Sequence, residues 1–371
     1  MPILRALALP GGDQFVTELR SAWEAGDAIV PVDPRLPARA RQRLLDTLQP
    51  QMVVDSDGSR TTREGVPTQE GDAVVVPTSG TSGDPKGVIH THESVRSSAL
   101  TISQYLDVDP AHDRWLACLP LSHIGGLSVV MRALLTDTAV EVHPGFEADA
   151  VTDAAQRGAT LVSLVPTALQ RLDPSLFRVI LLGGSALPAD RPANSVGTWG
   201  MTETGSGVVY ERYPLPGVEL RAVDGEIHVR APMLFRGYRA GTDTIEPFDT
   251  EGWFATGDMG SVAEDGRLSI HGRRGDLIIT GGENVWPGPI EQIIERHPDV
   301  AAVAVVGRPD PEWGAAVTAV VVPQNVVHPP KLDELRARVR EELPSWCAPK
   351  KLELVDDLPR TPLGKVQRNR I

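Results

Sequence analysis

The segment Thr78-Ser79-Gly80-Thr81-Ser82-Gly83-Asp84-Pro85-Lys86-Gly87 directly follows an apolar run at residues 73–76. This order predicts a strand that enters a loop rich in glycine and hydroxyl side chains. Glycines let backbone N–H groups close around phosphate oxygens, hydroxyls donate further hydrogen bonds, and Lys86 adds positive charge. The loop differs from the P-loop of NTPases, because Pro85 precedes Lys86 and Gly87 follows it. We interpret it as a phosphate-binding loop, with a flexible surface turn as the alternative.

The composition is that of a globular protein with room for two domains. The chain has 371 residues, of which 41% are hydrophobic and 23% charged. A net charge of −13 makes it a poor non-specific binder of nucleic acid, so any anion must be bound by local positive groups. The apolar runs are too short to cross a bilayer, and we see no signal peptide. Cys118 and Cys347 have no metal-type spacing, which fits a reducing cytoplasm and leaves a single disulfide open.

Helices and strands are expected to alternate from residue 73 onward. Before it, the sequence favours helices at 14–25 and 35–48 and a loop at 55–72, and is otherwise hard to interpret. The alternation predicts an α/β fold in which mainly parallel sheets are flanked by helices. Ligands bind such sheets at the carboxyl ends of the strands, where Pro77, Gly183 and Gly184 are expected. The expected helices are 93–106, 126–135 and 148–157, and the expected strands are 115–119, 140–143, 160–165 and 179–182.

The pattern changes twice in the second half of the chain. From about residue 217, short strands joined by Asp-Gly turns predict a small antiparallel β region. Beyond Arg273 the sequence predicts a compact α+β unit. The strands of the β region are expected at 219–223, 226–230, 253–255 and 268–271. The α+β unit is expected to contain helices at 287–297 and 332–343 and strands at 301–306, 317–322 and 351–354.

Five further segments carry residues suited to nucleotide chemistry. Trp199 suits stacking on a flat base, and Glu203 suits binding of Mg²⁺ beside phosphates. Asp258 is an acceptor for paired ribose hydroxyls, and Gly272-Arg273 follows, with Arg273 fifteen residues after it. Gly281 opens a tight turn before a helix. Lys365 stands alone in a loop bounded by Pro and Gly. Each alone has an ordinary alternative, such as a core tryptophan, a solvated glutamate or a surface lysine, whereas their order and separations are specific.

Taken in order, these segments resemble the acyl-adenylate-forming superfamily, which includes acyl-CoA synthetases, luciferases and peptide-synthetase adenylation domains. The resemblance covers roughly residues 73–371. Residues 78–87 are similar to the family's phosphate loop and 183–187 to its adenine and acyl-pocket strand end. Residues 200–203 resemble its Tyr-Gly-x-Thr-Glu element, with Trp199 where tyrosine is usual. The resemblance implies an ATP- and acid-binding domain at 1–273 and a small mobile domain at 274–371.

The resemblance also implies ATP, Mg²⁺ and coenzyme A as ligands. A carboxylate would attack the α-phosphorus of ATP to give acyl-AMP, and the CoA thiol would then expel AMP after the C-terminal domain rotates. Implied catalytic residues are Lys365, Thr202 and Glu203, with Glu203 as the metal ligand. Implied CoA residues are Gly281, Gly282 and Glu283. Implied ATP-binding residues are Thr78, Ser79, Gly80, Thr81, Ser82, Gly83, Lys86, Gly184, Ser185, Trp199, Gly200, Met201, Thr202, Asp258 and Arg273.

Two features depart from the family pattern. Gly275 stands where the family has a charged residue two positions after the hinge arginine, so a charge-controlled hinge is in question. The segment before the phosphate loop is about half the usual length, from which we expect some N-terminal strands to be missing or trimmed.

The acid substrate is indicated by residues 119–135. His123 lies where the family places a residue that lines the acyl pocket, with a buried structural histidine as the alternative. Arg132 interrupts an apolar helix, so it either points to solvent or meets a second carboxylate on the substrate. This spacing resembles the o-succinylbenzoate–CoA ligases of menaquinone biosynthesis. Gly126 and Ser185, with Gly125, are expected to leave room for an aromatic ring.

Other functions stay open at this stage. A ligase for another aryl or short acyl acid, or an adenylation enzyme that loads a carrier protein, would use the same motifs. A non-catalytic binding module is disfavoured because Lys86, Glu203, Asp258 and Lys365 are all present. We expect a cytoplasmic protein whose partners are a small carboxylic acid, ATP and CoA. The sequence does not decide the oligomeric state, a homodimer included.

Overall fold

The computed structural model describes residues 1–371 except 80–84, 185–186, 189 and 361–365. It divides into two compact units. The first comprises Met1–Glu219 with Val229–Phe254, and the second comprises Leu220–His228 with Ala255–Ile371. The functional boundary expected between residues 273 and 274 stays a prediction. None of the helices in the described ranges is long and apolar enough to cross a membrane.

The first unit contains an eight-stranded sheet with the order β17-β16-β6-β5-β2-β1-β3-β4. The four strands β5, β2, β1 and β3 are parallel, and the strands at both edges are antiparallel to their neighbours. The predicted loop at 55–72 is wrong at β4, which pairs with β3. Its strands are β1 (Leu4–Ala8), β2 (Ala28–Pro31), β3 (Met52–Asp55), β4 (Arg60–Thr62), β5 (Asp72–Ser79), β6 (Pro85–Thr91), β16 (Gly237–Ala240) and β17 (Asp243–Ile245).

A second sheet of seven strands has the order β13-β12-β11-β10-β9-β7-β8. The five strands β8, β7, β9, β10 and β11 are parallel, and β12 and β13 are each antiparallel to the strand before them. The predicted α/β class, with helices on mainly parallel sheets, is confirmed, and antiparallel strands extend both sheets at their edges. The strands are β7 (Arg114–Ala117), β8 (Ala139–Val142), β9 (Leu161–Leu164), β10 (Val179–Leu182), β11 (Ser195–Met201), β12 (Ser206–Tyr210) and β13 (Tyr213–Pro214).

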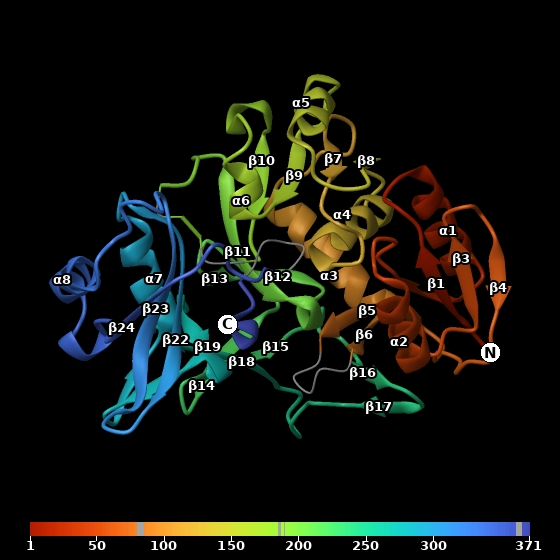
Figure 1. Cartoon of the computed structure of the whole chain (residues 1–371). Helices are drawn as coiled ribbons and strands as arrows, with labels where there is room; N and C mark the ends of the chain where they lie inside the picture. Colours follow the sequence, from red (N-terminus) through yellow and green to blue (C-terminus); the bar gives the residue numbers. More distant parts are fainter. Residues whose placement is uncertain (80–84, 185–186, 189, 361–365) are drawn as a thin grey trace. The chain divides into compact units, whose positions relative to one another are not determined.

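Two helices lie between these sheets (Figure 1). Helix α3 packs on β5 and β6, α4 packs on β7, β8 and β9, and the two helices contact each other. Helix α2 covers the outer face of the first sheet, and α5 and α6 cover that of the second. The predicted helix at 35–48 begins three residues later than expected. The helices are α1 (Asp13–Glu24), α2 (Ala38–Leu48), α3 (His92–Tyr105), α4 (Ile124–Leu135), α5 (Ala148–Gln156) and α6 (Pro166–Leu169).

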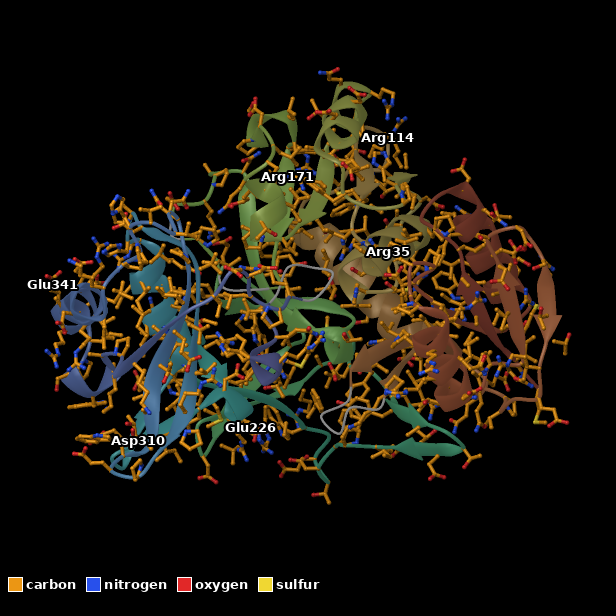
Figure 2. All side chains as sticks on the ribbon, in the orientation of Figure 1. Arg35, Arg114, Arg171, Glu226, Asp310 and Glu341 are labelled. Carbon is orange, nitrogen blue, oxygen red and sulfur yellow. The ribbon has the colours of Figure 1, made fainter. Side chains whose placement is uncertain are left out.

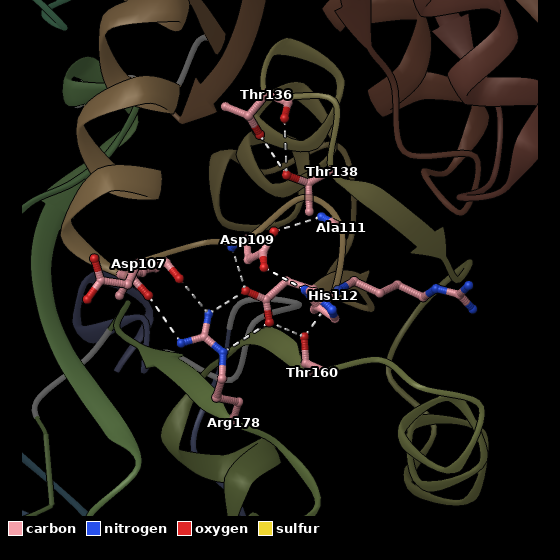
Figure 3. A network of polar contacts seen from close by, with 11 residues as sticks. Asp107, Asp109, Ala111, His112, Thr136, Thr138, Thr160 and Arg178 are labelled. Atoms are coloured by element: carbon pink, nitrogen blue, oxygen red, sulfur yellow. Dashed lines mark hydrogen bonds and ion pairs between the residues drawn. The ribbon is translucent and has the colours of Figure 1, made fainter.

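A polar network fixes the amino ends of β7, β9 and β10 (Figure 3). Arg178 Nη2 lies 2.6 Å from Asp113 Oδ2, and the Thr160 hydroxyl donates to Asp113 Oδ1 at 2.7 Å. Burial alone would raise the pKa of Asp113, but hydrogen bonds from Arg178 and Thr160 hold it below its usual value. Because ligands bind parallel sheets at the opposite, carboxyl ends, we assign this network to stability.

The second unit contains most of a four-stranded sheet and a separate α+β layer. The order of the four strands is β14-β15-β18-β19, and β18 and β19 are antiparallel. In the α+β layer, α7 and α8 pack their apolar side chains on β22 and β23. The elements are β14 (Glu219–Val223), β15 (Glu226–Arg230), β18 (Phe254–Val262), β19 (Leu268–Arg273), β20 (Ile278–Thr280), β21 (Glu283–Val285), α7 (Pro287–Glu295), β22 (Val300–Asp310), β23 (Gly314–Pro323), α8 (Leu332–Glu342) and β24 (Lys351–Leu354).

Candidate active site

The expected phosphate-binding segment connects two antiparallel strands of the first sheet. β5 ends at Ser79 and β6 begins at Pro85, with Thr78 opposite Lys86. The expectation that Lys86 lies in a loop is therefore wrong, because pairing with β5 holds it in a strand. Its ammonium lies 4.9 Å from the centre of the Tyr238 ring. The predicted residues Gly80, Thr81, Ser82 and Gly83 lie outside the described residues.

The 3₁₀ turn Thr202–Thr204 follows β11 and carries the predicted metal ligand. Two carbonyl groups of this turn are held by other parts of the unit: His90 Nε2 donates to the Thr202 oxygen at 2.7 Å, and the Phe235 N–H donates to the Glu203 oxygen at 2.9 Å. The Tyr238 hydroxyl donates to Glu203 Oε1 at 2.9 Å. The backbone and the carboxylate of Glu203 are therefore both fixed by partners distant in sequence.

His90 is fully buried beneath this turn. Burial lowers its pKa to about 4, so the ring is neutral at physiological pH. A carbonyl can only accept, so Nε2 carries the proton, and Nδ1 lies 3.3 Å from the Ser94 hydroxyl. Neither His90 nor Tyr238 was expected at the site, because neither lies in one of the motifs recognised in the sequence.

Close backbone packing explains the glycines around β10 and β11. A Cβ at Gly183 would lie 2.5 Å from Thr198 Oγ1, and one at Gly200 would lie 2.2 Å from the Ser206 carbonyl oxygen. Gly184 has a φ of +85°, in the left-handed region. Trp199 lies half-buried on β11, next to Gly200 and Met201. Contacts of these residues with ATP stay predictions, and Ser185 lies outside the described residues.

Arg132 is buried in α4, with a relative exposure of 2%. The alternative that it points to solvent is therefore wrong. Its Nη2 donates to the Ser206 hydroxyl at 3.2 Å, and its guanidinium lies 4.9 Å from the Trp115 ring centre. Among the described residues, Nε and Nη1 have no hydrogen-bond partner. Burial lowers the pKa of Arg132, although an arginine stays charged at physiological pH.

A small cavity lies beside this guanidinium. Its volume is about 10 Å³, enough for about one water molecule. Ser128 and Gly205 contribute to its wall, so it reaches from α4 to the residue that follows the Thr202–Thr204 turn. A buried cation beside a small polar space is suited to binding an anion through one bridging water.

His123 is half-buried at the start of α4. Burial lowers its pKa, and Asp33 and Arg35, on the segment after β2, lie close enough to act on it electrostatically. Of these residues, Arg35 is labelled in Figure 2. Gly126 has a packing role: a Cβ there would lie 2.3 Å from the Leu119 carbonyl oxygen. Close approach of the backbone thus explains why residue 126 is a glycine. Binding of the acid by His123 and Gly126 stays a prediction.

In the second unit, Asp258 and Arg273 are opposite each other on β18 and β19. Arg273 Nε lies 2.6 Å from Asp258 Oδ1, and the Asp258 N–H donates to Thr256 Oγ1 at 3.1 Å. Glu226 supports the neighbouring turn by accepting from the Gly257 N–H at 2.8 Å. Asp258 is 7% exposed, so its carboxylate is held in one orientation. Its predicted contact with ribose hydroxyls stays a prediction.

The predicted tight turn Gly281-Gly282 joins β20 and β21 as a two-residue hairpin. Both glycines have positive φ, at +60° and +86°, which this type of turn requires. A Cβ at Gly281 would lie 2.8 Å from the Trp313 ring, so the turn packs against that side chain. Glu283 follows as the first residue of β21. Their predicted contact with CoA stays a prediction.

Lys365 lies outside the described residues, and contacts are described only for the residues before 361 and after 365. Arg360 bridges Val366, and three residues after Lys365 the guanidinium of Arg368 pairs with Asp276 at 3.1 Å and with Glu291. At Gly275, the position of the family's charged hinge residue, a Cβ would meet nothing within 4 Å. Both cysteines are free, which excludes the disulfide.

Two family models match the chain. Residues 55–239 match the model described as AMP-binding enzyme, and residues 289–365 match the AMP-binding enzyme C-terminal domain. The chain belongs to this family. The resemblance to adenylate-forming enzymes is thereby confirmed.

Named relatives are similar in sequence to this chain over most of its length. The 2-succinylbenzoate–CoA ligase of Listeria monocytogenes is 33% identical over 354 residues, covering 88% of this chain and 73% of the relative. The enzyme of the same name from Bacillus anthracis is 35% identical over 335 residues, covering 80% and 69%.

The fold of this chain is similar to that of solved structures. The o-succinylbenzoate CoA synthetase of Bacillus subtilis, in complex with the acyl-adenylate OSB-AMP, has a TM-score of 0.86 and 28% identity, covering 99% of this chain and 87% of that chain. ATP-bound MatB from Rhodopseudomonas palustris has a TM-score of 0.88 and 26% identity, covering 100% and 88%. Both are structures of proteins captured with an adenine nucleotide or an adenylate.

Proposed function

We propose that this chain is an AMP-forming acid–CoA ligase that converts 2-succinylbenzoate, ATP and CoA to 2-succinylbenzoyl-CoA, AMP and pyrophosphate. Family membership and the names of the relatives support the reaction class. The observation that carries the substrate is Arg132, a buried guanidinium with no carboxylate partner among the described residues. An isolated buried cation is costly unless an anion accompanies it in the working enzyme.

In the first half-reaction, an oxygen of the acid carboxylate attacks the α-phosphorus of ATP, and the bond to pyrophosphate breaks. Two anions must approach, so the site needs positive charge. Lys86 would bind the phosphates from its strand, and Lys365 would bridge the carboxylate and the α-phosphate. Thr202 would orient phosphate oxygens beside them. Asp258 would accept hydrogen bonds from the ribose hydroxyls.

The residues present fit Mg²⁺ at Glu203. Mg²⁺ takes oxygen ligands and often needs only one or two protein carboxylates, the rest being phosphates and waters. A ready-made cluster of three metal-binding side chains is therefore not required, and the described part of the chain contains none. When bound, the ion would neutralise charge on the phosphates.

2-Succinylbenzoate carries two carboxylates, so the site must recognise the one that does not react. One carboxylate is activated, and the other remains charged inside the pocket. The cavity beside Arg132 has room for about one water, so we propose that a bridging water connects the second carboxylate to the unpartnered nitrogens. Ser206, which Arg132 contacts, lies four residues after Thr202, so this end of the acid site adjoins the nucleotide site.

In the second half-reaction, the CoA thiol attacks the acyl carbon and AMP leaves. We propose that the mobile C-terminal part withdraws Lys365 and brings the Gly281-Gly282 turn to the thiol. Gly281 packs against Trp313, whereas a Cβ at Gly282 would meet nothing within 4 Å, so the backbone at Gly282 is open to a pantetheine arm.

Mass spectrometry of the products tests the proposal. The protein is incubated with ATP, Mg²⁺ and each of three acids: 2-succinylbenzoate, 4-oxo-4-phenylbutanoate, which lacks the ring carboxylate, and benzoate. The thiol is supplied as CoA or as a holo carrier protein. We expect a CoA thioester of 2-succinylbenzoate to dominate. Equal turnover of a monoacid would favour a ligase for another aryl acid, and acylation of the carrier alone would favour a carrier-loading enzyme. The role in menaquinone biosynthesis, the cytoplasmic location and the oligomeric state stay predictions.

A further inference from the structure

Tyr238, on β16, contacts both of the charged groups assigned above to the phosphates and their metal ion. Its hydroxyl donates to Glu203 Oε1 at 2.9 Å, and its ring lies under the Lys86 ammonium at 4.9 Å. Glu203 lies in the turn that follows β11 of the second sheet, and Lys86 lies near the start of β6 in the first sheet. The tyrosine is thus a physical link between them.

We propose that Tyr238 is a positioning residue of the nucleotide site, whose hydroxyl orients the Glu203 carboxylate for the metal ion and whose ring holds Lys86 in place for the phosphates. The inference rests on the proposed function, which assigns these two residues to Mg²⁺–ATP. Tyr238 itself touches neither the metal nor the reacting atoms.

The ring of Tyr238 is held by its surroundings. β16 pairs with β6, so Tyr238 lies opposite Val88. On another side the ring makes an edge contact with Phe235, with centres 4.8 Å apart. Tyrosine has only two side-chain torsions, so packing of the ring fixes the direction of the hydroxyl.

The backbone of Glu203 is already anchored, so its side chain is the remaining degree of freedom. His90 and Phe235 hold the two carbonyl groups of the turn. A carboxylate on a fixed backbone still has three rotatable bonds, and a metal ligand must be placed to within a few tenths of an ångström. The hydrogen bond from Tyr238 occupies Oε1 and directs Oε2 as the oxygen for the metal. A group that orients a metal ligand in this way contributes to metal affinity without binding the ion.

The contact with Lys86 has a similar effect. An ammonium over an aromatic face is attracted to it, which restricts a long and flexible side chain. Binding of a phosphate then orders less of the lysine, because part of that ordering is already present in the free protein. Phenylalanine preserves this contact and removes only the hydroxyl, so the two effects can be separated by substitution.

The alternative is that Tyr238 merely fills the aromatic cluster with Phe235, Phe248 and Phe254. The test uses the full-length protein, Mn²⁺ as a spectroscopic probe for Mg²⁺, and a non-hydrolysable ATP analogue. Electron paramagnetic resonance measures the Kd of Mn²⁺ in the presence of the analogue. Calorimetry measures the Kd of the analogue without metal. Thermal melts establish that each variant is folded.

We expect Tyr238→Phe to raise the Kd of Mn²⁺ about tenfold and to leave metal-free binding of the analogue unchanged. Tyr238→Leu should raise both dissociation constants, because it also removes the ring beneath Lys86. Tyr105→Phe is the matched control, since Tyr105 is half-exposed on α3 and its ring contact with Tyr210 survives. It should change neither value.

Three results would overturn the proposal. If Tyr238→Phe binds Mn²⁺ like the unmodified protein while Glu203→Gln does not, the hydroxyl has no positioning role and the assignment of Glu203 stands. If Glu203→Gln also binds Mn²⁺ normally, the assignment of the metal to Glu203 fails, and the inference fails with it. If Tyr238→Leu and Tyr238→Phe bind the metal-free analogue equally well, the ring does not serve Lys86.

Discussion

Replacing Arg132 by methionine should stabilise the ligand-free protein while impairing use of the acid. Arg132 is 2% exposed, and two of its nitrogens have no partner among the described residues. Burying a polar group without a hydrogen bond is unfavourable in the free enzyme, and the penalty is removed with the guanidinium. Methionine keeps most of the aliphatic stem and adapts to irregular space, so the substitution leaves little cavity.

The size of the effect follows from the contacts of the guanidinium. Relieving two unpartnered nitrogen atoms at about 2 kcal/mol each gains about 4 kcal/mol. Losing the 3.2 Å hydrogen bond to Ser206 and the contact with the Trp115 ring at 4.9 Å costs about 1 kcal/mol each. The balance is about 2 kcal/mol of stabilisation. At roughly 2–4 °C per kcal/mol for a unit of this size, the melting temperature should rise by about 4–8 °C.

Arg178→Met is the matched control. Arg178 pairs with Asp113, which is 6% exposed, so its removal leaves a buried carboxylate unpaired. We expect a loss of about 2 kcal/mol, less than for a fully buried pair because Arg178 is 41% exposed. Calorimetric melts of both variants without ligand measure the two effects. The reasoning is refuted if Arg132→Met lowers the melting temperature as Arg178→Met does, since Arg132 would then be an ordinary structural arginine.

Three further predictions concern the rest of the site. Lys365→Ala should reduce acyl-AMP formation at least about 100-fold, the lower end of the effect of removing a preorganised charge. It should leave thioester formation from supplied acyl-AMP nearly intact. Stopped-flow assays measure each half-reaction, and an equal loss in both contradicts the role of Lys365. Asp258→Asn should weaken binding of ATP about tenfold, or about 1.4 kcal/mol, and should change binding of the acid little. Calorimetry measures both affinities, and an unchanged affinity for ATP would remove Asp258 from the nucleotide site. His90 has a pKa near 4 when folded, against 6.5 in the unfolded chain, so the unfolded chain binds an extra proton between these values. The free energy of unfolding should therefore fall by about 3 kcal/mol as the pH drops from 6.5 to 4. His90→Gln should lack this part of the pH dependence. Urea titrations of both proteins across this pH range measure it, and the same pH dependence in both would disprove the assignment.

Regular patterns made much of the fold predictable from the sequence. Strands β10, β14, β15 and β24 begin and end at the expected residues, because each is a short run followed within two residues by Gly, Pro or Asp. Strand β11 was missed, since Gly197 and Gly200 lower its intrinsic β-propensity and pairing with β10 and β12 forms it instead. Lys86 was expected in a loop for the same reason: Pro85 and Gly87 are turn residues locally, and pairing with β5 overrides them.

The candidate site was only partly accessible to sequence reasoning. Glycine-rich turns and charged residues in motifs could be recognised, because their chemistry is local. Tyr238 and His90 could not, because their partners lie 35 and 112 residues away in the chain. Arg132 was singled out as an arginine in an apolar helix, but only the structure decides that it is buried and incompletely paired.

The most direct test of the central claim is ATP–pyrophosphate exchange driven by 2-succinylbenzoate or by 4-oxo-4-phenylbutanoate, in the unmodified protein and in Arg132→Met. The account predicts that the unmodified protein prefers the diacid and that the substitution reduces this preference about 30-fold, corresponding to about 2 kcal/mol for a buried charged contact. An unchanged preference in Arg132→Met would contradict it, because a different group would then recognise the second carboxylate.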